Sequence, residues 1–526
     1  MERGAGRKAD LVVALACLLA FLVVSWYTNF PSVAPGNQMF GWEYGFVAES
    51  LIKGRGFSDP FGVPSGPTAW MAPGPVALVA AEFLVFGVRT PQALWAALTL
   101  RCVGLAAAVY LLLRCLDDGR RYRWRYVAAV AFVAVMGSLP DFFLDLHDIW
   151  LVVLLALALA RCFVPLLDGR RDAPRALLLA VSVIAPMTSP ALVPPFVALW
   201  GWVFFRARKE RRESDAAGGG RVATSPFRLG ASSLALCLGS VLAWTVVTAS
   251  RVGIVAPVKS NMWYDFFQAN VLDPDGVMEV STFYRHHPIH SPAALEQYVR
   301  EGERAFMESR RAESLAFVRR HPGQFLARVG YRARNAFVFL RPTDDVWEVD
   351  DDQLDESDVA CLETAGVIAL DRHQSTPDAP LHVWTNLSES QERFARELAW
   401  LGPVAPDTIL DQWQLARSLV GELHQHAWTR LRGIVLAALP TLALLLGFLD
   451  PGVRRDHVFR ISALVYLTFL APYVLISHYA RYQMFMLGIQ ALIVPFGFVA
   501  GWRLCRRIAG RSQPDHDSEL QPHGAR

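Results

Sequence analysis

The sequence has few charged residues for its length. Of its 526 residues, 19% are charged and 53% are hydrophobic, and the mean hydropathy is +0.27. Soluble domains carry roughly 25% charged residues, so this composition excludes a single soluble domain of ordinary composition and predicts a polytopic membrane protein. The formal net charge is only +3, and no global charge therefore points to a nucleic-acid partner.

Cysteine is scarce outside the apolar segments, and a phosphate-binding loop is missing. Six of the seven cysteines lie in or beside apolar runs, and Cys361 is the exception. The large polar region around Cys361 therefore has no disulfide framework. The glycines at 218–220 follow no predicted strand and precede no G-K-[ST] sequence, which indicates a flexible linker rather than a nucleotide site.

Apolar runs, in contrast, are abundant. A membrane-spanning helix needs about 20 mostly apolar residues. The segments that approach this pattern are 11–30, 91–116, 126–139, 149–165, 176–188, 190–205, 229–250, 431–449, 461–477 and 484–503. The sequence therefore predicts an all-α polytopic membrane protein with about ten transmembrane helices. The stretch 73–88 is shorter and contains Glu82, which predicts an interfacial helix that lies along the membrane.

Arginine-rich connections alternate with less basic ones along the chain. The positive-inside rule assigns to the cytoplasm the N-terminus, the connections 117–125, 168–175, 206–213 and 451–460, and the tail from Arg503. The opposite side then receives 31–90, 140–148, 251–430 and 478–482. In 251–430, 18 arginines and lysines accompany 27 aspartates and glutamates. We therefore expect both termini to be cytoplasmic and 251–430 to lie outside.

These patterns divide the chain into parts. They are an N-terminal membrane module at 1–250 with its first outer loop at 31–90, an extracytoplasmic domain at 251–430, C-terminal membrane helices at 431–510 and a disordered cytoplasmic tail at 511–526. Apolar spacing in 292–340 predicts a helix, and Pro322 with Gly323 predicts that a second helix begins there. We expect a mainly helical extracytoplasmic insertion.

Polar residues from separate segments are predicted to meet at the outer face. They include Glu43, Tyr44, Glu49 and Asp59 in the first loop, Asp141, Asp145, His147 and Asp148 in PDFFLDLHD, Arg251, Lys259, Asn261 and Asn270 after the seventh span, and His478, Arg481 and Tyr482 before the last. Each residue alone fits an ordinary interfacial loop, because a charge at the boundary reaches water. Together, carboxylates can act as general bases while cations hold a phosphate. The combination predicts transfer from a lipid-linked phosphate donor.

Several motifs occur in a recognisable order. They are GWEYGFVAESLIKGRGF with GPTAW in the first loop, ALLLAVSVIAPMTSPALVPPFVALW at 176–200, PVKSN and QAN within 257–270, HP, EQY, GE and HPxxF within 287–325, and YARY at 479–482. This order resembles the superfamily C (GT-C) integral-membrane glycosyltransferases, in the bacterial branch related to protein mannosyltransferases and the lipid A aminoarabinose transferase. The resemblance covers most of the chain except about 345–430, which is expected to be an insertion.

The resemblance implies a GT-C-like fold, a function and a location. The function is inverting transfer of a sugar from a polyprenyl-phosphate-linked donor to an extracytoplasmic lipid, glycan or protein. The location is the bacterial inner membrane, with the active site on the outer face. Glu43 is expected to be the catalytic base, where many relatives carry Asp, and Asp148 a second catalytic acid. The expected donor-phosphate ligands are Arg481, Lys259, Tyr482 and His478, and the expected substrate contacts are Tyr44, Asp59, Asn261 and Asp141.

Other interpretations stay open. Asp148 and Asp141 suit a divalent metal that screens the phosphate, and the histidines at 286, 287 and 290 are a weaker zinc candidate. A lipid or solute transporter predicts charges inside spans, where Arg101 lies, and broken helices such as the proline-rich region 186–195. A catalytically inactive envelope assembly factor is a further alternative, and it would bind a partner through the insertion.

Overall fold

The chain is helical in nearly every part that the structure describes. The computed structural model describes residues 2–29, 40, 42–117, 124–137, 148–168, 174–216, 225–273, 275–278, 282, 286–289, 291–340, 369–370, 383–384 and 433–509. Two short strands, β1 (Ala369–Leu370) and β2 (Val383–Trp384), pair antiparallel. The predicted class of a helical polytopic membrane protein is confirmed at this level.

Every predicted span coincides with an apolar helix. Among the described residues, 7 helices are long and apolar enough to cross a membrane. They are α1 (Glu2–Asn29), α4 (Pro91–Leu116), α6 (Ile149–Leu167), α8 (Val193–Ala216) with the short η3 (Pro190–Leu192) before it, α9 (Ser225–Arg251), α20 (His457–Ile476) and α22 (Leu487–Ile508). The remaining predicted spans are shorter helices: α5 (Arg125–Gly137), α7 (Arg175–Thr188), and η8 (Ile434–Ala438) continued by α18 (Leu439–Leu449).

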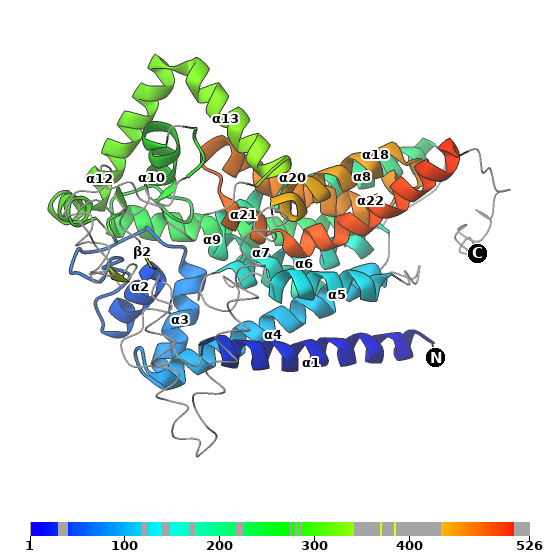
Figure 1. The fold of residues 1–526 in the computed structure, drawn as a ribbon, viewed down its shortest axis with the longest axis horizontal. Helices are drawn as coiled ribbons and strands as arrows, with labels where there is room; N and C mark the ends of the chain where they lie inside the picture. The colour runs from blue at the N-terminus through cyan, green and yellow to red at the C-terminus, as the bar shows by residue number, and fades with distance from the viewer. Residues whose placement is uncertain are drawn as a thin grey trace.

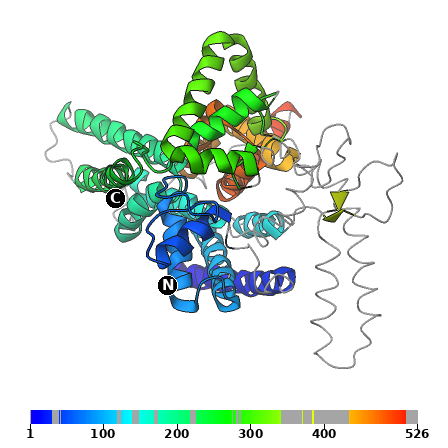
Figure 2. The ribbon, with the colours of Figure 1, turned by 90° about the vertical axis from the view of Figure 1, so that its left-hand side faces the viewer.

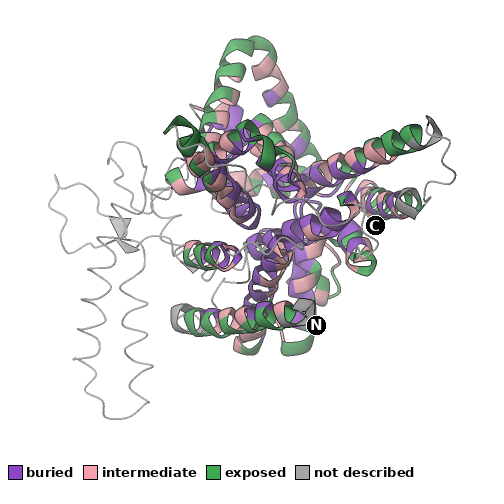
Figure 3. Ribbon diagram, turned by 90° about the vertical axis from the view of Figure 1, so that its right-hand side faces the viewer, coloured by how far each residue is buried: buried purple, intermediate pink, exposed green. Residues whose placement is uncertain are grey.

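The long helices lie side by side and enclose an apolar core (Figure 1). Helix α4 packs against α1 and α6, and α22 packs against α18 and α20. Figure 3 shows buried residues on the inner faces of these helices and exposed residues on their outer faces. Large apolar side chains are among the exposed ones, including Leu19, Phe205 and Phe498. Outward apolar side chains suit a bundle that is surrounded by lipid.

The helices of the loops gather at one end of the bundle, opposite the first residues of α1 and the last of α22 (Figure 1). They are α2 (Trp42–Ile52), α3 (Pro73–Phe86), α10 (Met262–Phe267) with the π-helical turn η4 (Gln268–Leu272), α12 (Pro292–Arg320), α13 (Pro322–Phe337) and α21 (Ala480–Met484). Helices α12 and α13 form an inverted V (Figure 1, Figure 2). The predicted helix start at Pro322 is confirmed, and the stretch predicted as interfacial is α3.

Ion pairs connect helices at the opposite end. Asp10 of α1 is completely buried, and its carboxylate lies 3.4 Å from Arg114 Nη1 and 3.2 Å from Arg125 Nη2. Asp117 pairs with the same two arginines. The cluster joins α1, α4 and α5. The short helix α19 (Pro451–Arg454) follows α18 in the chain, and the Asp450 carboxylate caps its N-terminus.

Arg332 attaches α13 to the C-terminal membrane helices. Its buried guanidinium donates from Nε to Val474 O (2.8 Å) and from Nη2 to Leu475 O (3.1 Å), and Nη1 donates to Asn270 Oδ1 (3.1 Å). Val474 and Leu475 are in the last turn of α20, where carbonyls lack helical partners and a cation is favoured. Burial and the nearby Arg328 lower the Arg332 pKa to about 10, so the side chain is charged at neutral pH.

We expect Arg332→Lys to destabilise the protein by about 2–4 kcal/mol, because an ammonium cannot reproduce the planar fork and leaves buried carbonyls unpaired. The measurement is thermal unfolding of the full chain in detergent. The control is Arg320→Lys, since Arg320 is an exposed arginine at the end of α12. Equal unfolding temperatures for both variants and the wild type would contradict the assigned role.

The chain leaves α13 and enters η8 at one place. Leu340 N donates to Gly433 O at 3.4 Å. A Cβ at position 433 would lie 2.5 Å from Leu340 O, so the close approach requires glycine. The expected mainly helical insertion at 345–430 lies outside the described residues, apart from β1 and β2.

Candidate active site

Three segments meet at Asp148, which precedes α6. Arg481 of α21, 333 residues further along the chain, donates from Nη2 to Asp148 Oδ1 at 2.6 Å. The hydroxyl of Tyr44, in α2, lies near enough to the same carboxylate for hydrogen bonding to contribute to a raised Tyr44 pKa. Burial raises the pKa of Tyr44 well above its usual value, and the Asp148 charge raises it further. Tyr44 therefore keeps its proton and acts as the donor.

Glu43 lies beside this contact and faces His287. Its side chain is 16% exposed, and Glu43 Oε1 lies 3.5 Å from His287 Nε2. The buried His287 ring accepts the Ile289 backbone N–H at Nδ1, at 3.2 Å. A neutral ring that accepts at Nδ1 carries its proton on Nε2. His287 is thus placed to orient the Glu43 carboxylate, which remains partly accessible.

A third carboxylate, Asp265 of α10, shares the cations of the site. Burial raises the Asp265 pKa, and the charges of Lys259 and Arg481 partly offset that shift. Tyr479 interacts electrostatically with Arg481, Asp265 and Asp148. Lys259 and Arg481, which come from two distant segments, therefore act on one group. Asp265 was absent from the predicted site, although it follows Asn261 by one helical turn.

Five buried polar atoms of the site have no hydrogen-bond partner among the described residues. They are Asn261 Oδ1, the Tyr264 hydroxyl, Gln268 Nε2, Trp70 Nε1 and Arg481 Nε. Asn261, Tyr264 and Gln268 are spaced i, i+3 and i+7, which places them along one face of the α10 segment. Buried polar groups are normally paired. These atoms are therefore available to a polar ligand.

Aromatic rings pack together at Trp70 and Tyr264. The ring centroids of Trp70 and Tyr264 are 5.4 Å apart, and each ring lies close to His287, at 5.4 and 5.2 Å respectively. Phe61, Tyr298 and Phe306 extend the cluster. The described site thus combines charged groups at Asp148 and Arg481 with an apolar aromatic wall on the side of Glu43 and His287.

Asp59 shapes the first loop. Its Oδ1 accepts the backbone N–H groups of Ser65 (2.9 Å) and Gly66 (3.1 Å), while Oδ2 accepts from Ser50 Oγ (3.0 Å) and Arg55 Nε (2.9 Å). The backbone φ of Asp59 is 59°, a conformation that aspartate tolerates better than most residues. Since both oxygens are engaged within the loop, we assign Asp59 to loop structure rather than to the predicted substrate contact.

His478, an expected donor-phosphate ligand, carries no positive charge in the structure. It is completely buried, and its Nδ1 lies 3.0 Å from Asn335 Nδ2. Burial and the neighbouring Arg332 lower the His478 pKa to about 3, so the ring is neutral at physiological pH. The predicted partner Tyr482 stacks on Tyr473 with centroids 3.7 Å apart. Both residues support the segment that carries Arg481.

Glu303 of α12 was not among the site residues predicted from the sequence. Its carboxylate accepts hydrogen bonds from Thr68 Oγ1 (2.5 Å), Ala69 N (2.9 Å), Ser260 Oγ (2.6 Å) and the Tyr298 hydroxyl (2.7 Å). It therefore joins the first loop and the segment before α10 to α12. The preceding Gly302 has φ 75° and interrupts the helical geometry. A glycine within a helical pattern was the available signal.

The structure describes only one of the two carboxylates that were expected to bind a divalent metal. Asp141 lies outside the described residues, and Asp148 is paired with Arg481. Within the described part of the chain, no group of three or more histidine, cysteine, aspartate or glutamate side chains is arranged to hold a metal ion. His290 of the zinc alternative also lies outside that part.

Comparison with known proteins returns no relative. No protein-family model, curated protein or solved structure matches this chain. Its function is therefore inferred from the residues of the site and their geometry.

Proposed function

We propose that the protein is a GT-C-type membrane glycosyltransferase, which transfers a sugar from a polyprenyl-phosphate-linked donor to a hydroxyl of a lipid, glycan or protein acceptor. The observation that carries the proposal is the contact of Tyr44, Asp148 and Arg481 beside Glu43, at one end of an apolar helical bundle. A donor with an apolar tail and an anionic head suits a centre where apolar helices end and cations begin.

The donor phosphate is assigned to Arg481 and Lys259. Arg481 uses Nη2 for Asp148, and its Nε is hydrogen-bonded to no described residue. A guanidinium has five N–H donors in a fixed plane, so it can keep the Asp148 contact and still bind a phosphate oxygen. Lys259 adds a second positive charge, which acts on the same Asp265 carboxylate as Arg481 does. Both cations stabilise the phosphate as it leaves.

Glu43 is assigned as the general base. It accepts the proton of the acceptor hydroxyl, whose oxygen attacks the anomeric carbon from the face opposite the phosphate. The carbon–oxygen bond to the phosphate breaks, and the phosphate leaves with the bonding electrons, which inverts the anomeric centre. His287 keeps the Glu43 carboxylate oriented during this step. Asn261, Tyr264 and Trp70 supply hydrogen-bonding groups and an aromatic surface for the sugar.

The proposed location is the bacterial inner membrane, with cytoplasmic termini and the site on the outer face. Two observations support it. The first residues of α1 and the last of α22 lie at the end of the bundle opposite the site (Figure 1). That end also contains Arg114 and Arg125, which pair with Asp10 of α1, and the positive-inside rule favours arginines on a cytoplasmic side.

The test is transfer of radiolabelled sugar from a panel of polyprenyl-phosphate donors, in membranes that contain the wild type, Arg481→Ala or no copy of the chain. We expect product only with the wild type, and at least a hundredfold less with Arg481→Ala, as for loss of one stabilising group at a developing charge. Immunoblots establish equal protein levels. Product at wild-type rates with Arg481→Ala, or none from any donor with the wild type, would reject the proposal.

We expect Tyr44→Phe to lower the transfer rate about 5- to 10-fold, because loss of one hydrogen bond to Asp148 costs roughly 1 kcal/mol or slightly more. The protein should stay folded, since the ring and its packing are retained. Initial rates at saturating donor measure the effect. Tyr110→Phe, in α4 and away from Asp148 in the chain, is the control. An unchanged rate for Tyr44→Phe would mean that this hydrogen bond does not support catalysis.

A further inference from the structure

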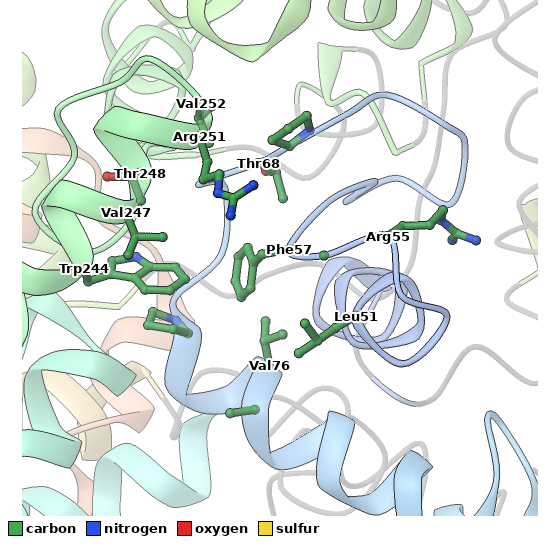
Figure 4. Close-up of a pocket in the computed structure, with 14 residues that line it drawn as sticks. Leu51, Arg55, Phe57, Thr68, Val76, Trp244, Val247, Thr248, Arg251 and Val252 are labelled. Carbon is green, nitrogen blue, oxygen red and sulfur yellow. The ribbon is translucent and has the colours of Figure 1, made fainter.

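A cavity of about 430 Å³ lies between the last turns of α9, the first turns of α3 and the first loop (Figure 4). Leu51, Phe57, Val76, Trp244 and Val247 give it a largely apolar lining. Its volume falls within the roughly 300–1,000 Å³ of typical ligand sites. None of its lining residues belongs to the contact of Glu43, Tyr44, Asp148 and Arg481, so the cavity is a separate feature.

One positive charge faces this cavity. Arg251, the last residue of α9, turns its guanidinium toward the cavity, whereas the side chain of Arg55 points away from it (Figure 4). Arg55 is engaged by Asp59, with Nε 2.9 Å from Oδ2. Arg251 forms no ion pair with any residue in the described part of the chain. The apolar cavity therefore has an unneutralised cation at its edge.

The cavity adjoins the surface that faces lipid. Helix α9 is one of the candidate membrane spans, and its Leu242 and Val246 side chains are 65% and 59% exposed. Trp244 and Val247, from the same two turns, form the cavity wall. Tryptophan is also the residue that favours the membrane–water boundary. A ligand that enters from this side comes from the bilayer and has an apolar chain.

We propose that this cavity binds an anionic phospholipid of the surrounding bilayer. The headgroup phosphate lies at Arg251, and an acyl chain lies against Leu51, Phe57 and Trp244. Net negative charge is required because Arg251 is unopposed, and an apolar chain is required by the lining. The inference does not depend on the transferase proposal.

A lipid in this cavity contacts two segments that continue into the candidate active site. Trp244 Nε1 donates to Val258 O at 2.8 Å, next to Lys259. Thr68, which also lines the cavity, donates to Glu303. We therefore expect the lipid to stabilise the segment that carries Lys259 and also the end of the first loop.

The test is photo-crosslinking of the purified full chain in phosphatidylcholine nanodiscs that contain a trace of phosphatidylglycerol with a diazirine in its acyl chain. Crosslinked peptides are mapped by mass spectrometry. We expect crosslinks at Leu51, Phe57 or Trp244, which added phosphatidylglycerol displaces about fivefold better than added phosphatidylcholine, as for one cation near a headgroup. Arg251→Gln should remove that preference. Arg228→Gln, at the other end of α9, should keep it.

A second variant separates occupancy from charge. Ala77 is an exposed residue of α3 that lines the cavity, and Ala77→Trp should fill the space and abolish the crosslinks without disturbing the core. Crosslinks spread evenly over the lipid-facing helices, equal competition by phosphatidylcholine, or no effect of Arg251→Gln and Ala77→Trp would overturn the proposal. Stronger competition by a polyprenyl phosphate would overturn it in favour of a donor lipid at this place.

Discussion

Glu43→Gln is expected to reduce sugar transfer by a factor of about 10²–10⁴, the usual contribution of a general base. The amide has nearly the same shape as the carboxylate and can keep the contact with His287, but it cannot accept the acceptor's proton. Donor binding should change little, because Arg481 and Lys259 hold the phosphate. We therefore expect Glu43→Gln to lose most of its kcat at a nearly constant KM. Initial rates over a range of donor concentrations, in the same membranes, measure both constants.

The same helix supplies the control for Glu43. Glu49 of α2 is already neutralised by Lys53 (2.5 Å) and Arg89 (2.8 Å), so Glu49→Gln should retain transfer within a few-fold. Glu43→Asp should retain measurable activity, because aspartate keeps a carboxylate that can accept the proton. If Glu43→Gln transfers sugar at the wild-type rate, the base is another residue, and Asp148 and Asp265 are the next to replace.

Glu303→Leu is expected to destabilise the fold by about 3–5 kcal/mol, since it removes the acceptor from four donors that remain buried. Glu303→Gln should cost less, because an amide is able to bond hydroxyls that reorient. The measurement is the unfolding temperature of the full chain in detergent. Glu308→Ala is the matched control, since Glu308 is an exposed residue of the same helix paired with Arg304. Equal losses at Glu303 and Glu308 would contradict the role of Glu303.

The pH dependence of stability gives an independent measurement on Glu303. Burial raises the Glu303 pKa above its usual 4.5, and hydrogen bonds from Ser260, Thr68 and Tyr298 partly offset this. Between the unfolded and the folded pKa, the folded state therefore binds more proton than the unfolded chain. The contribution of Glu303 is full below pH 4.5 and is lost as the pH rises through its folded pKa. Glu303→Gln should remove this part of the slope, and an unchanged slope would contradict the assignment.

The overall class and the meeting of the charged loops were predictable. Apolar runs mark spans because each backbone polar group must be satisfied within the bilayer, and the order of spans decides which loops share a side. Asp148 and Arg481 are 333 residues apart in the chain, yet topology alone placed both on one face. The contact between them, and the bond from Tyr44, required only that three neighbouring helix ends converge.

Buried partnerships were not predictable from local patterns. Glu303 contacts Thr68 across 235 residues, and neither helical periodicity nor composition encodes such a pair. His478 reads in sequence as one more polar residue beside Arg481, but its neutrality depends on burial and on Arg332 from another helix. The same holds for Asp265, whose closeness to Lys259 and Arg481 follows from the orientation of α10. Such roles depend on packing between distant segments.

The hydrogen bond between Leu340 and Gly433 has a consequence for how this protein can diversify. The chain leaves the helical bundle at Leu340 and returns to it at the adjacent Gly433. Residues 341–432 can therefore be lengthened, shortened or exchanged during evolution while α13 and η8 keep their spacing. Loop length itself affects the entropy of loop closure only weakly. Lineages can thus acquire a new recognition module at this junction while Glu43, Asp148 and Arg481 stay in register. Sequence divergence should concentrate between the two positions and fall sharply at Gly433, where no side chain fits.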